Sequence, residues 1–339
     1  MPVAQPTVQH DFLPKTPHED LKQILQDDLI NVNKMIVTYL SSDVTLIPLI
    51  AQHLILAGGK RIRPLITVAS AKLCGYTGTR HIPLAASIEF VHAATLLHDD
   101  VIDESTTRRN QPTANALWGN KASILVGDFL FARAFELMVR TDSIAVLEII
   151  AEASKKISEG EILQLDALHN MDISKENYFR IIAAKTATLF SAGCKSGAML
   201  ATQDTNKISA LHTFGHNLGM VFQIVDDILD YTGDATTIGK DVGNDIREGK
   251  ITLPLIRAYE AAHPDQKDFI QHLLKTETIE EEDFHKLLHI LSEHEAIESC
   301  HETAQTYYQK ALESLEIFPN TPLKSALQNL AFHSTRRHA

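Results

Sequence analysis

Ala93-Ala94-Thr95-Leu96-Leu97-His98-Asp99-Asp100-Val101-Ile102-Asp103 is an apolar, helix-compatible run that ends in three aspartates. The segment Phe222-Gln223-Ile224-Val225-Asp226-Asp227-Ile228-Leu229-Asp230 repeats the pattern with the same spacing. On a helix, residues i and i+4 share one face about 6 Å apart, so the first and last aspartates of each cluster point the same way. Crowded carboxylates repel unless a cation lies between them, and Mg²⁺ binds through a few carboxylates and substrate phosphate oxygens. The clusters therefore predict a site where several Mg²⁺ ions hold a diphosphate.

The composition indicates a folded protein without a nucleic-acid partner. Hydrophobic residues fill 44% of the 339 positions, and the net charge of −12 argues against a general nucleic-acid binder. No run approaches the roughly 18 apolar residues of a membrane span, and positions 1–20 lack the apolar core of a signal peptide. The three cysteines lie far apart, as is typical of buried thiols in a reducing compartment. We therefore expect a soluble, cytoplasmic protein.

Helical patterns dominate the chain. The first residues spaced for one helical face are Leu21, Ile24, Leu25, Leu29, Ile30 and Val32. Few segments alternate as strands do, and breaks fall at 58–59, 75–78, 110–112, 170–173, 233–249 and 263–264. Segments 82–101 and 210–231 are apolar nearly all round, as helices in the middle of a bundle are. We predict an all-α, single-domain helical bundle over 19–339, preceded by a flexible arm at 1–18.

Several basic residues are candidates to bind the phosphates that the metals bind. They lie after Gly58-Gly59, after the first cluster and after the second cluster, and they are Lys60, Arg63, Arg108, Arg109, Lys240 and Lys250. Each alone could equally be a solvated surface charge. Lys185 differs because it interrupts the apolar run 181–190, and a buried lysine is costly without an anionic partner. We therefore expect Lys185 to contact a ligand or a metal-site carboxylate.

Taken in order along the chain, these motifs resemble those of the trans-isoprenyl diphosphate synthases. The motifs are Gly58-Gly59-Lys60-Arg61-Ile62-Arg63-Pro64, then Leu96-Leu97-His98-Asp99-Asp100-Val101-Ile102-Asp103-Glu104-Ser105 with Arg108-Arg109, then Lys185-Thr186, Gln223-Ile224-Val225-Asp226-Asp227-Ile228-Leu229-Asp230-Tyr231 and Gly239-Lys240-Asp241. The resemblance runs from near residue 20 to the C-terminus. It implies an all-α bundle of the isoprenoid synthase type around a central active-site cavity, usually as a homodimer.

The resemblance also implies that an allylic diphosphate joins isopentenyl diphosphate head-to-tail. About three Mg²⁺ ions would neutralise the leaving diphosphate. The implied metal-site residues are Asp99 and Asp103 for two ions and Asp226 for the third, supported by Asp100, Asp227 and Asp230. The residues implied for the allylic diphosphate are Arg108, Lys185 and Lys240, with Gln223 and Thr186 beside them. Those implied for isopentenyl diphosphate are Lys60, Arg63, His92 and Arg109. Catalysis would rest on Asp99, Asp103, Asp226 and Lys185. Lys250 would bind phosphate, with closure of its loop as the alternative role.

The residues that precede Asp99 bear on product length in this family. Short-chain enzymes place an aromatic residue five positions before the motif, whereas this chain has Ala94, which leaves room for a growing tail. Phe90 would lie about 14 Å deeper at 1.5 Å per residue, and Phe131 and Phe135 are further candidates for the tunnel floor. We predict a long product of about eight to ten isoprene units (C40–C50), of the kind used for quinone side chains, which would partition into a membrane.

Three alternative functions stay open. A shorter-chain geranylgeranyl or farnesyl diphosphate synthase would differ chiefly in the tunnel floor. A non-catalytic subunit of a heteromeric synthase typically lacks one or both aspartate clusters, and this chain has both. A class I terpene cyclase usually has an Asn/Ser/Glu metal triad in place of the second cluster and lacks a second diphosphate site. This chain has the second aspartate cluster and the Lys60 and Arg63 candidates for a second diphosphate, and both features favour the synthase over the cyclase.

Overall fold

The chain folds into a bundle of α-helices. The computed structural model describes residues 18–336, apart from 57–58, 109–110, 171–173, 234–242 and 277. The helices of the first half are α1 (Glu19–Ile24), α2 (Gln26–Tyr39), α3 (Leu46–Leu56), α4 (Ile62–Leu73), α5 (His81–Ile102), α6 (Ala114–Trp118), α7 (Asn120–Val139) and α8 (Ile144–Asp166). Those of the second half are α9 (Lys175–Ile182), the π-helix η1 (Ala183–Ala187), α10 (Thr188–Ala201), α11 (Thr205–Thr232), α13 (Asn244–Arg247), α14 (Leu253–Ala261), α15 (Pro264–Leu273), α16 (Glu281–Glu293), α17 (Ala296–Ser314) and α18 (Pro322–Ser334). Strands are confined, within the described residues, to the short antiparallel pair β1 (Thr107–Arg108) and β2 (Gln111–Pro112).

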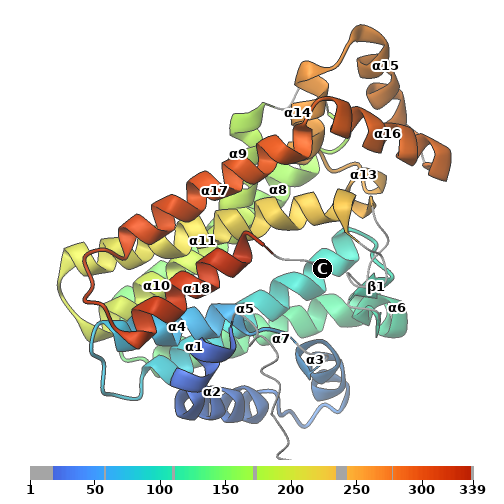
Figure 1. Ribbon diagram of the computed structural model, residues 1–339. Helices are drawn as coiled ribbons and strands as arrows, with labels where there is room; N and C mark the ends of the chain where they lie inside the picture. Colours follow the sequence, from blue (N-terminus) through green and yellow to red (C-terminus); the bar gives the residue numbers. More distant parts are fainter. Residues whose placement is uncertain are drawn as a thin grey trace, which may run out of the picture.

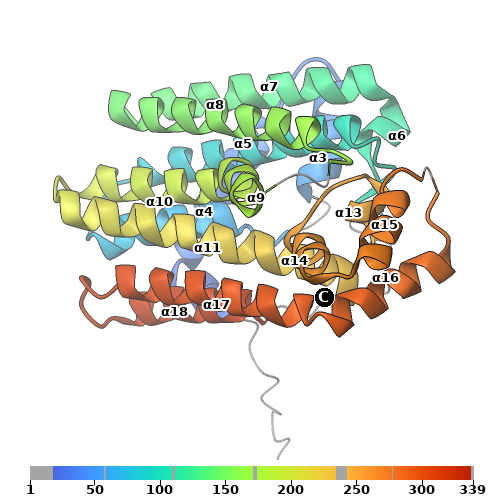
Figure 2. The same cartoon turned by 90° about the horizontal axis from the view of Figure 1, so that it is seen from above.

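The long helices lie roughly parallel in three layers. Figure 2 shows α7 and α8 in one outer layer, α4, α5, α10 and α11 in the middle, and α17 and α18 in the other outer layer. α5 packs against α7, α10 contacts α4, α8 and α11, and α11 packs along α17. Figure 1 shows α1 to α3 at one side of the bundle and α13 to α16 at one end. The predicted all-α fold is confirmed.

The two helices that carry the aspartates lie in the middle layer because they are apolar on nearly every side. α5 agrees closely with the predicted 82–101, and its Leu84 and Phe90 side chains are fully buried. α11 is capped at its N-terminus by Asp204, whose carboxylate accepts two backbone N–H groups of the first turn. Burying a leucine or phenylalanine side chain contributes about 1.5–3 kcal/mol. The core therefore fixes both helices, and their C-terminal aspartates line one cavity.

The N-terminal helices differ from the expectation. One continuous apolar face was predicted from Leu21 to Val32, whereas the helix is interrupted at Leu25 and continues as α2. Leu21, Leu25 and Val32 are buried, but Ile24 and Ile30 are 45% and 43% exposed. The backbone hydrogen bonds from Leu25 to Leu21 and from Leu29 to Leu25 keep the helical pattern across the interruption, so the buried face of α1 continues into α2 and the two exposed isoleucines lie outside it.

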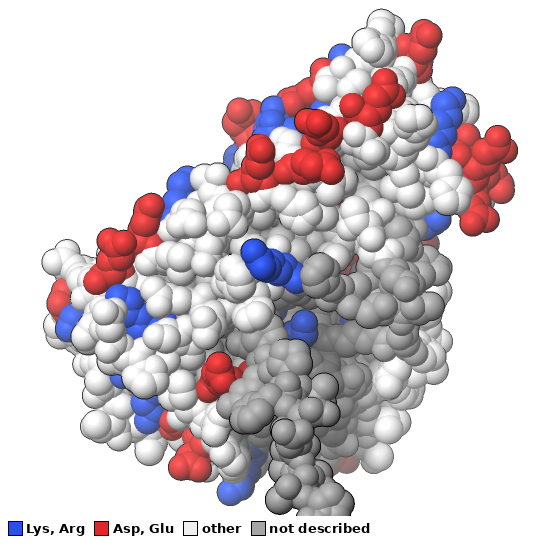
Figure 3. All heavy atoms as spheres, viewed as in Figure 1, with Lys and Arg blue, Asp and Glu red and all other residues white. Residues whose placement is uncertain are grey.

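The surface agrees with the acidic composition. Figure 3 shows acidic side chains gathered over α15, α16 and α17, and α16 begins with Glu281, Glu282 and Asp283. Within the described residues, we find no helix both long and apolar enough to span a bilayer. The three cysteines are free thiols; Cys194 and Cys300 are buried as predicted, and Cys74 is half-buried.

Candidate active site

A cavity of about 540 Å³ lies where the C-terminal parts of α5 and α11 approach α8, α9 and η1. Most residues that the sequence analysis singled out line this cavity: Lys60, Arg63, His92, Asp99, Asp103, Arg108, Lys185, Thr186, Gln223, Asp226, Asp227, Asp230 and Lys250. Asp100 is not part of the lining, and Arg109 and Lys240 lie outside the described residues. The fold thus brings both aspartate clusters and most of the selected basic residues to one place.

Asp99 and Asp103 face the cavity from the C-terminal end of α5, one helical turn apart. Asp99 is 9% exposed, and its Oδ1 atom has no hydrogen-bond partner among the described residues. Burial raises the pKa of Asp99 above its ordinary value; the charge of Lys185 opposes this rise and that of Asp103 adds to it. A buried carboxylate oxygen without a donor is costly, and a hard cation is the partner that its chemistry fits.

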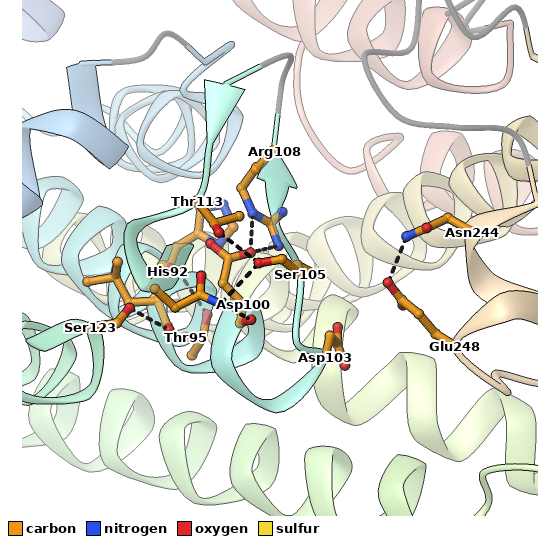
Figure 4. Close-up of polar contacts among 12 residues, drawn as sticks. His92, Thr95, Asp100, Asp103, Ser105, Arg108, Thr113, Ser123, Asn244 and Glu248 are labelled. Carbon is orange, nitrogen blue, oxygen red and sulfur yellow. Dashed lines mark hydrogen bonds and ion pairs between the residues drawn. The ribbon is translucent and has the colours of Figure 1, made fainter. Parts of the chain in front are cut away.

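Asp100 lies on a different side of α5, because successive residues of a helix are rotated by about 100°. Its side chain is 1% exposed, and its Oδ1 atom accepts hydrogen bonds from Arg108 Nε at 2.8 Å and Nη2 at 2.7 Å. Figure 4 shows Arg108 reaching down from β1 to this carboxylate. Asn115 donates to the Asp100 backbone carbonyl at 3.1 Å. Asp100 therefore fixes the β1–β2 hairpin, and so fixes Arg108, at the edge of the cavity.

The second cluster divides in the same way. Asp226 is exposed along the cavity, whereas Asp227 is buried and accepts hydrogen bonds from Tyr178 Oη at 2.5 Å and Gln223 Nε2 at 2.7 Å. Burial raises the pKa of Asp227 well above its ordinary value. Gln223 in turn accepts a hydrogen bond from Thr186 at 2.7 Å. The network joins α9, η1 and α11, and it explains why Thr186 and Gln223 lie beside the cluster.

Asp230 holds the backbone that follows α11. Its two carboxylate oxygens accept the N–H groups of Asn244 at 3.2 Å and Asp245 at 3.1 Å, at the start of α13. Gly243, which precedes them, has a φ of 78°, a left-handed conformation that glycine adopts without strain. Asp230 therefore ties the segment 243–250 to the end of α11.

Lys185 lies in η1, a π-helical turn of the kind often found at functional sites. Its ammonium donates to Glu161 Oε2 of α8 at 2.7 Å. Its anionic partner is therefore Glu161 and not one of the predicted metal-site carboxylates. The sequence analysis missed Glu161, because a single glutamate in an amphipathic helix gives no local signal. Burial and the charge of Asp99 raise the pKa of Glu161 to about 7. Glu161 also lines the cavity.

The two arginines near the start of α4 have different partners. Arg63 donates from Nη1 to His92 Nε2 at 3.1 Å, and its guanidinium lies 4.5 Å from the ring centre of Phe190. Arg61, which has a left-handed backbone conformation, instead pairs with Glu89. Lys60 is exposed and lines the cavity together with Arg63 and His92. The residues predicted for a second diphosphate are therefore neighbours.

Lys250 bridges the two sides of the site. Its ammonium contacts Asp103 Oδ2 at 2.8 Å and Glu248 Oε2 at 2.5 Å. Figure 4 shows Asp103 at the end of α5 and Glu248 on the segment that faces it, with the Asn244 side chain directed at Glu248. The charges of Asp245, Asp103 and Glu248 raise the pKa of Lys250, although burial alone would lower it. These contacts with Asp103 and Glu248 support closure of the loop, one of the two roles that the sequence left open for Lys250.

The residues expected to control tunnel depth lie in different environments. Thr95 and Leu96 line the cavity, whereas Ala94 and Phe90 are fully buried and do not appear on its lining. Phe135 is 44% exposed, so its assignment to the tunnel floor was wrong; it lies on the outward side of α7. Phe131 is partly buried, and its ring is tilted against the His98 ring, with the two ring centroids 6.1 Å apart.

Comparison with known proteins identifies the kind of molecule to which this site belongs. The polyprenyl synthetase family model matches residues 44–291. The chain is 42% identical to octaprenyl diphosphate synthase of Escherichia coli K12, over 94% of this chain and 98% of that protein. It is 41% identical to all-trans-nonaprenyl-diphosphate synthase (geranyl-diphosphate specific) of Rhodobacter capsulatus, over 92% and 95%.

Solved structures give the same result. Polyprenyl synthase from Caulobacter crescentus CB15, complexed with calcium and isoprenyl diphosphate, superposes with a TM-score of 0.92 at 45% identity, covering 95% of this chain and 98% of that one. A decaprenyl diphosphate synthase from Rhodobacter capsulatus gives 0.91 at 43% identity, with 95% and 100% covered. The resemblance seen in the motifs is confirmed, and the chain belongs to the polyprenyl synthetase family of prenyltransferases.

Proposed function

We propose that this chain condenses an allylic diphosphate with successive isopentenyl diphosphates to form a long all-trans polyprenyl diphosphate. The observation that carries the proposal is a single cavity lined both by two aspartate clusters and by Lys60, Arg63 and His92. A reaction between two diphosphates needs two anion sites that open into one space. A terpene cyclase would need only the first of them.

Mg²⁺ is the cofactor that the cavity fits best. The donors are carboxylates, and Asp99 presents a buried Oδ1 atom without a hydrogen-bond partner in the described part of the chain. Asp99, Asp103 and Asp226 would be the direct ligands of about three ions. Asp100, Asp227 and Asp230 would keep those ligands and their neighbours in place. Bound Mg²⁺ would neutralise the leaving diphosphate and so help the allylic C–O bond to break.

The basic residues would orient the two substrates. Lys185 and Arg108 would hold the leaving diphosphate, and Lys240 stays a prediction for the same role. Lys60, Arg63 and His92 would hold isopentenyl diphosphate, with Arg109 as a further predicted contact, so that its double bond lies beside the allylic carbon. The new C–C bond would form there, and the released diphosphate would accept the proton that is lost. No protein nucleophile is needed.

The length of the product follows from the relatives and the cavity wall. The similar proteins are named for octaprenyl, nonaprenyl and decaprenyl products. Thr95 and Leu96 form part of the wall on α5 and are small enough, or flexible enough, to let a tail pass. We therefore favour about eight to ten isoprene units over the geranylgeranyl or farnesyl alternative.

A product assay would test this function directly. The purified chain would be incubated with Mg²⁺, labelled isopentenyl diphosphate and one primer at a time: geranyl, farnesyl or geranylgeranyl diphosphate. Mass spectrometry should then detect C40–C50 products, with the Asp99→Ala variant as the inactive control. C15 or C20 products alone would assign the chain to the shorter synthases. No product with any primer would favour the non-catalytic subunit.

We also propose a homodimer in which the outer faces of α7 and α8 meet those of a second copy. Leu125, Val139 and Ile144 are 67%, 68% and 77% exposed, and Ile162 and Leu165 continue this apolar surface on α8. Figure 2 shows α7 and α8 together in one outer layer. Analytical ultracentrifugation should give about twice the chain mass of 37.6 kDa, and Leu125→Glu should shift it toward the monomer. A monomeric wild-type protein would refute the dimer.

Release of the product would be slow and assisted by a membrane surface. Each buried methylene contributes about 0.8 kcal/mol, so every added isoprene unit strengthens the hold on the tail. Detergent or vesicles should therefore raise the steady-state rate while leaving the single-turnover rate unchanged. Equal rates with and without detergent would show that release does not limit turnover.

A further inference from the structure

Glu161 lines the cavity but takes no part in the chemistry proposed above. Its Oε2 atom accepts a hydrogen bond from Lys185 Nζ at 2.7 Å, and its buried Oε1 atom has no hydrogen-bond partner among the residues that the structure describes. The two side chains are only 17% and 21% exposed. An ion pair this enclosed is little screened by water, so it influences what else the Lys185 ammonium can bind.

The pair is fixed by close packing of the backbones that carry it. Gly160, the residue before Glu161, has no room for a side chain. A Cβ atom there would lie 2.8 Å from the Ala184 Cβ atom and 2.9 Å from the backbone nitrogen of Lys185. On the opposite side, a Cβ atom at Gly219 of α11 would lie 2.5 Å from the Ala187 Cα atom. η1 is therefore clamped between α8 and α11. The position of Lys185 opposite Glu161 follows from this clamp.

The charges around Glu161 make a carboxylate costly at this place. Burial is the largest cause of its raised pKa, and the charges of Asp99 and Asp103 add to the rise. Lys185 is shared, because its charge also stabilises ionised Asp99. Glu161 and Asp99 thus both draw on the charge of Lys185.

We propose that Glu161 is a positioning residue that holds Lys185 in the substrate-free enzyme and competes with the leaving diphosphate for its ammonium. The proposal rests on the role of Lys185 proposed above. When diphosphate binds, Lys185 is drawn from Glu161 toward the anion; when diphosphate leaves, Glu161 takes the ammonium back. Glu161 therefore weakens the hold on inorganic pyrophosphate and speeds its departure between condensations, which an enzyme that repeats its reaction many times requires.

The Glu161→Gln variant of the full-length protein tests this idea. Glutamine keeps an oxygen that can accept the Lys185 hydrogen bond but removes the competing charge. Calorimetric titration of inorganic pyrophosphate at saturating Mg²⁺ and pH 8 should show about tenfold tighter binding, roughly the difference between a charge-assisted and a neutral hydrogen bond. Inhibition by pyrophosphate should strengthen in parallel, KM for the allylic primer should fall, and kcat should fall. Glu159→Gln, an exposed neighbour on α8 with the same change in net charge, should leave all four unchanged.

The gain in affinity separates this role from a merely structural one, since a damaged site binds more weakly. Unchanged or weaker pyrophosphate binding in Glu161→Gln, beside a wild-type enzyme that binds pyrophosphate and makes product, would overturn the inference and leave the proposed function intact. A wild-type chain that neither binds pyrophosphate nor makes product would overturn both. Should Glu161→Gln fail to fold, as judged by circular dichroism, Glu161→Asp applies: its shorter side chain should tighten pyrophosphate binding about threefold, and no gain would overturn the inference.

Discussion

Replacing Lys250 by methionine should strongly destabilise the metal-free protein. Its ammonium lies 2.8 Å from Asp103 and 2.5 Å from Glu248, and the three side chains are only 16–19% exposed. Removing one partner of a buried ion pair costs about 3–5 kcal/mol, because the other partner stays buried without compensation. Methionine preserves most of the side-chain volume, so lost packing adds little. We expect the free energy of unfolding to fall by about 3 kcal/mol.

The pH of the experiment follows from the direction of the pKa shift. The pKa of Lys250 is raised above its ordinary 10.5 by Asp245, Asp103 and Glu248, so the folded state binds this proton more tightly than the unfolded state does. The stabilisation is fully present below pH 10.5 and is lost as the pH rises through the higher folded-state value. Measurements at pH 8 therefore report all of it.

Urea denaturation followed by circular dichroism, with a chelator present, would measure the loss. Lys155→Met is the matched control: Lys155 pairs with Glu152 at the same 2.8 Å, but the two side chains are 58% and 50% exposed. Exposed pairs contribute little, so this control should unfold like the wild type. Adding Mg²⁺ and pyrophosphate should restore part of the stability of Lys250→Met, because cations then neutralise Asp103.

Two results would refute this reasoning. If Lys250→Met unfolds at the same urea concentration as Lys155→Met, the bridge from Asp103 to Glu248 does not hold the segment 243–250 in place. If the loss is present but Mg²⁺ with pyrophosphate does not reduce it, Asp103 does not face the metal site.

Three further changes test other parts of the site. Asp99→Ala or Asp226→Ala should lower turnover by at least about a thousandfold while leaving the circular dichroism spectrum unchanged, since either variant loses a metal ligand; near-normal rates would disprove the assignment. Thr95→Phe should narrow the cavity wall and shorten the products seen by mass spectrometry, and an unaltered product distribution would exclude this position from the tunnel. Glu161→Gln should stabilise the metal-free protein by up to about 3 kcal/mol at pH 8, because the glutamate pKa rises from 4.5 to about 7 on folding and ionisation then favours the unfolded chain. That gain should shrink as the pH falls toward 5, and equal urea midpoints of variant and wild type at pH 8 would contradict it.

The parts of the structure that sequence could predict are those set by strong local patterns. α5 and α11 were placed within a few residues because long apolar runs with few breaks can only be central helices. The face shared by Asp99 and Asp103 followed from helical spacing alone. The same spacing places Asp100 and Asp227 off that face, yet it cannot say what lies opposite them. Their partners come from segments far along the chain.

Other features depend on packing between distant segments and left no local trace. Glu161 reaches Lys185 only because Gly160 lets α8 approach η1, and nothing near Glu161 in the sequence indicates that approach. The interruption at Leu25 gave no local signal either, because its flanking residues all suit a helix. Phe135 was misassigned because an aromatic residue on an apolar helix reads the same whether its side chain points inward or outward.

The last aspartates of the two clusters act on one segment from opposite ends. Asp230 holds the backbone at Asn244 and Asp245, while Asp103 holds Lys250 through its ammonium. The backbone contacts of Asp230 do not compete with a cation for charge, but the Lys250 contact does, because Mg²⁺ at Asp103 would take over the neutralisation that the lysine provides. Metal binding should therefore loosen only the Lys250 end of the segment 243–250. The ammonium would then be held by Glu248 alone and could turn toward phosphate, so the two roles that the sequence left open for Lys250 would be successive states of one residue.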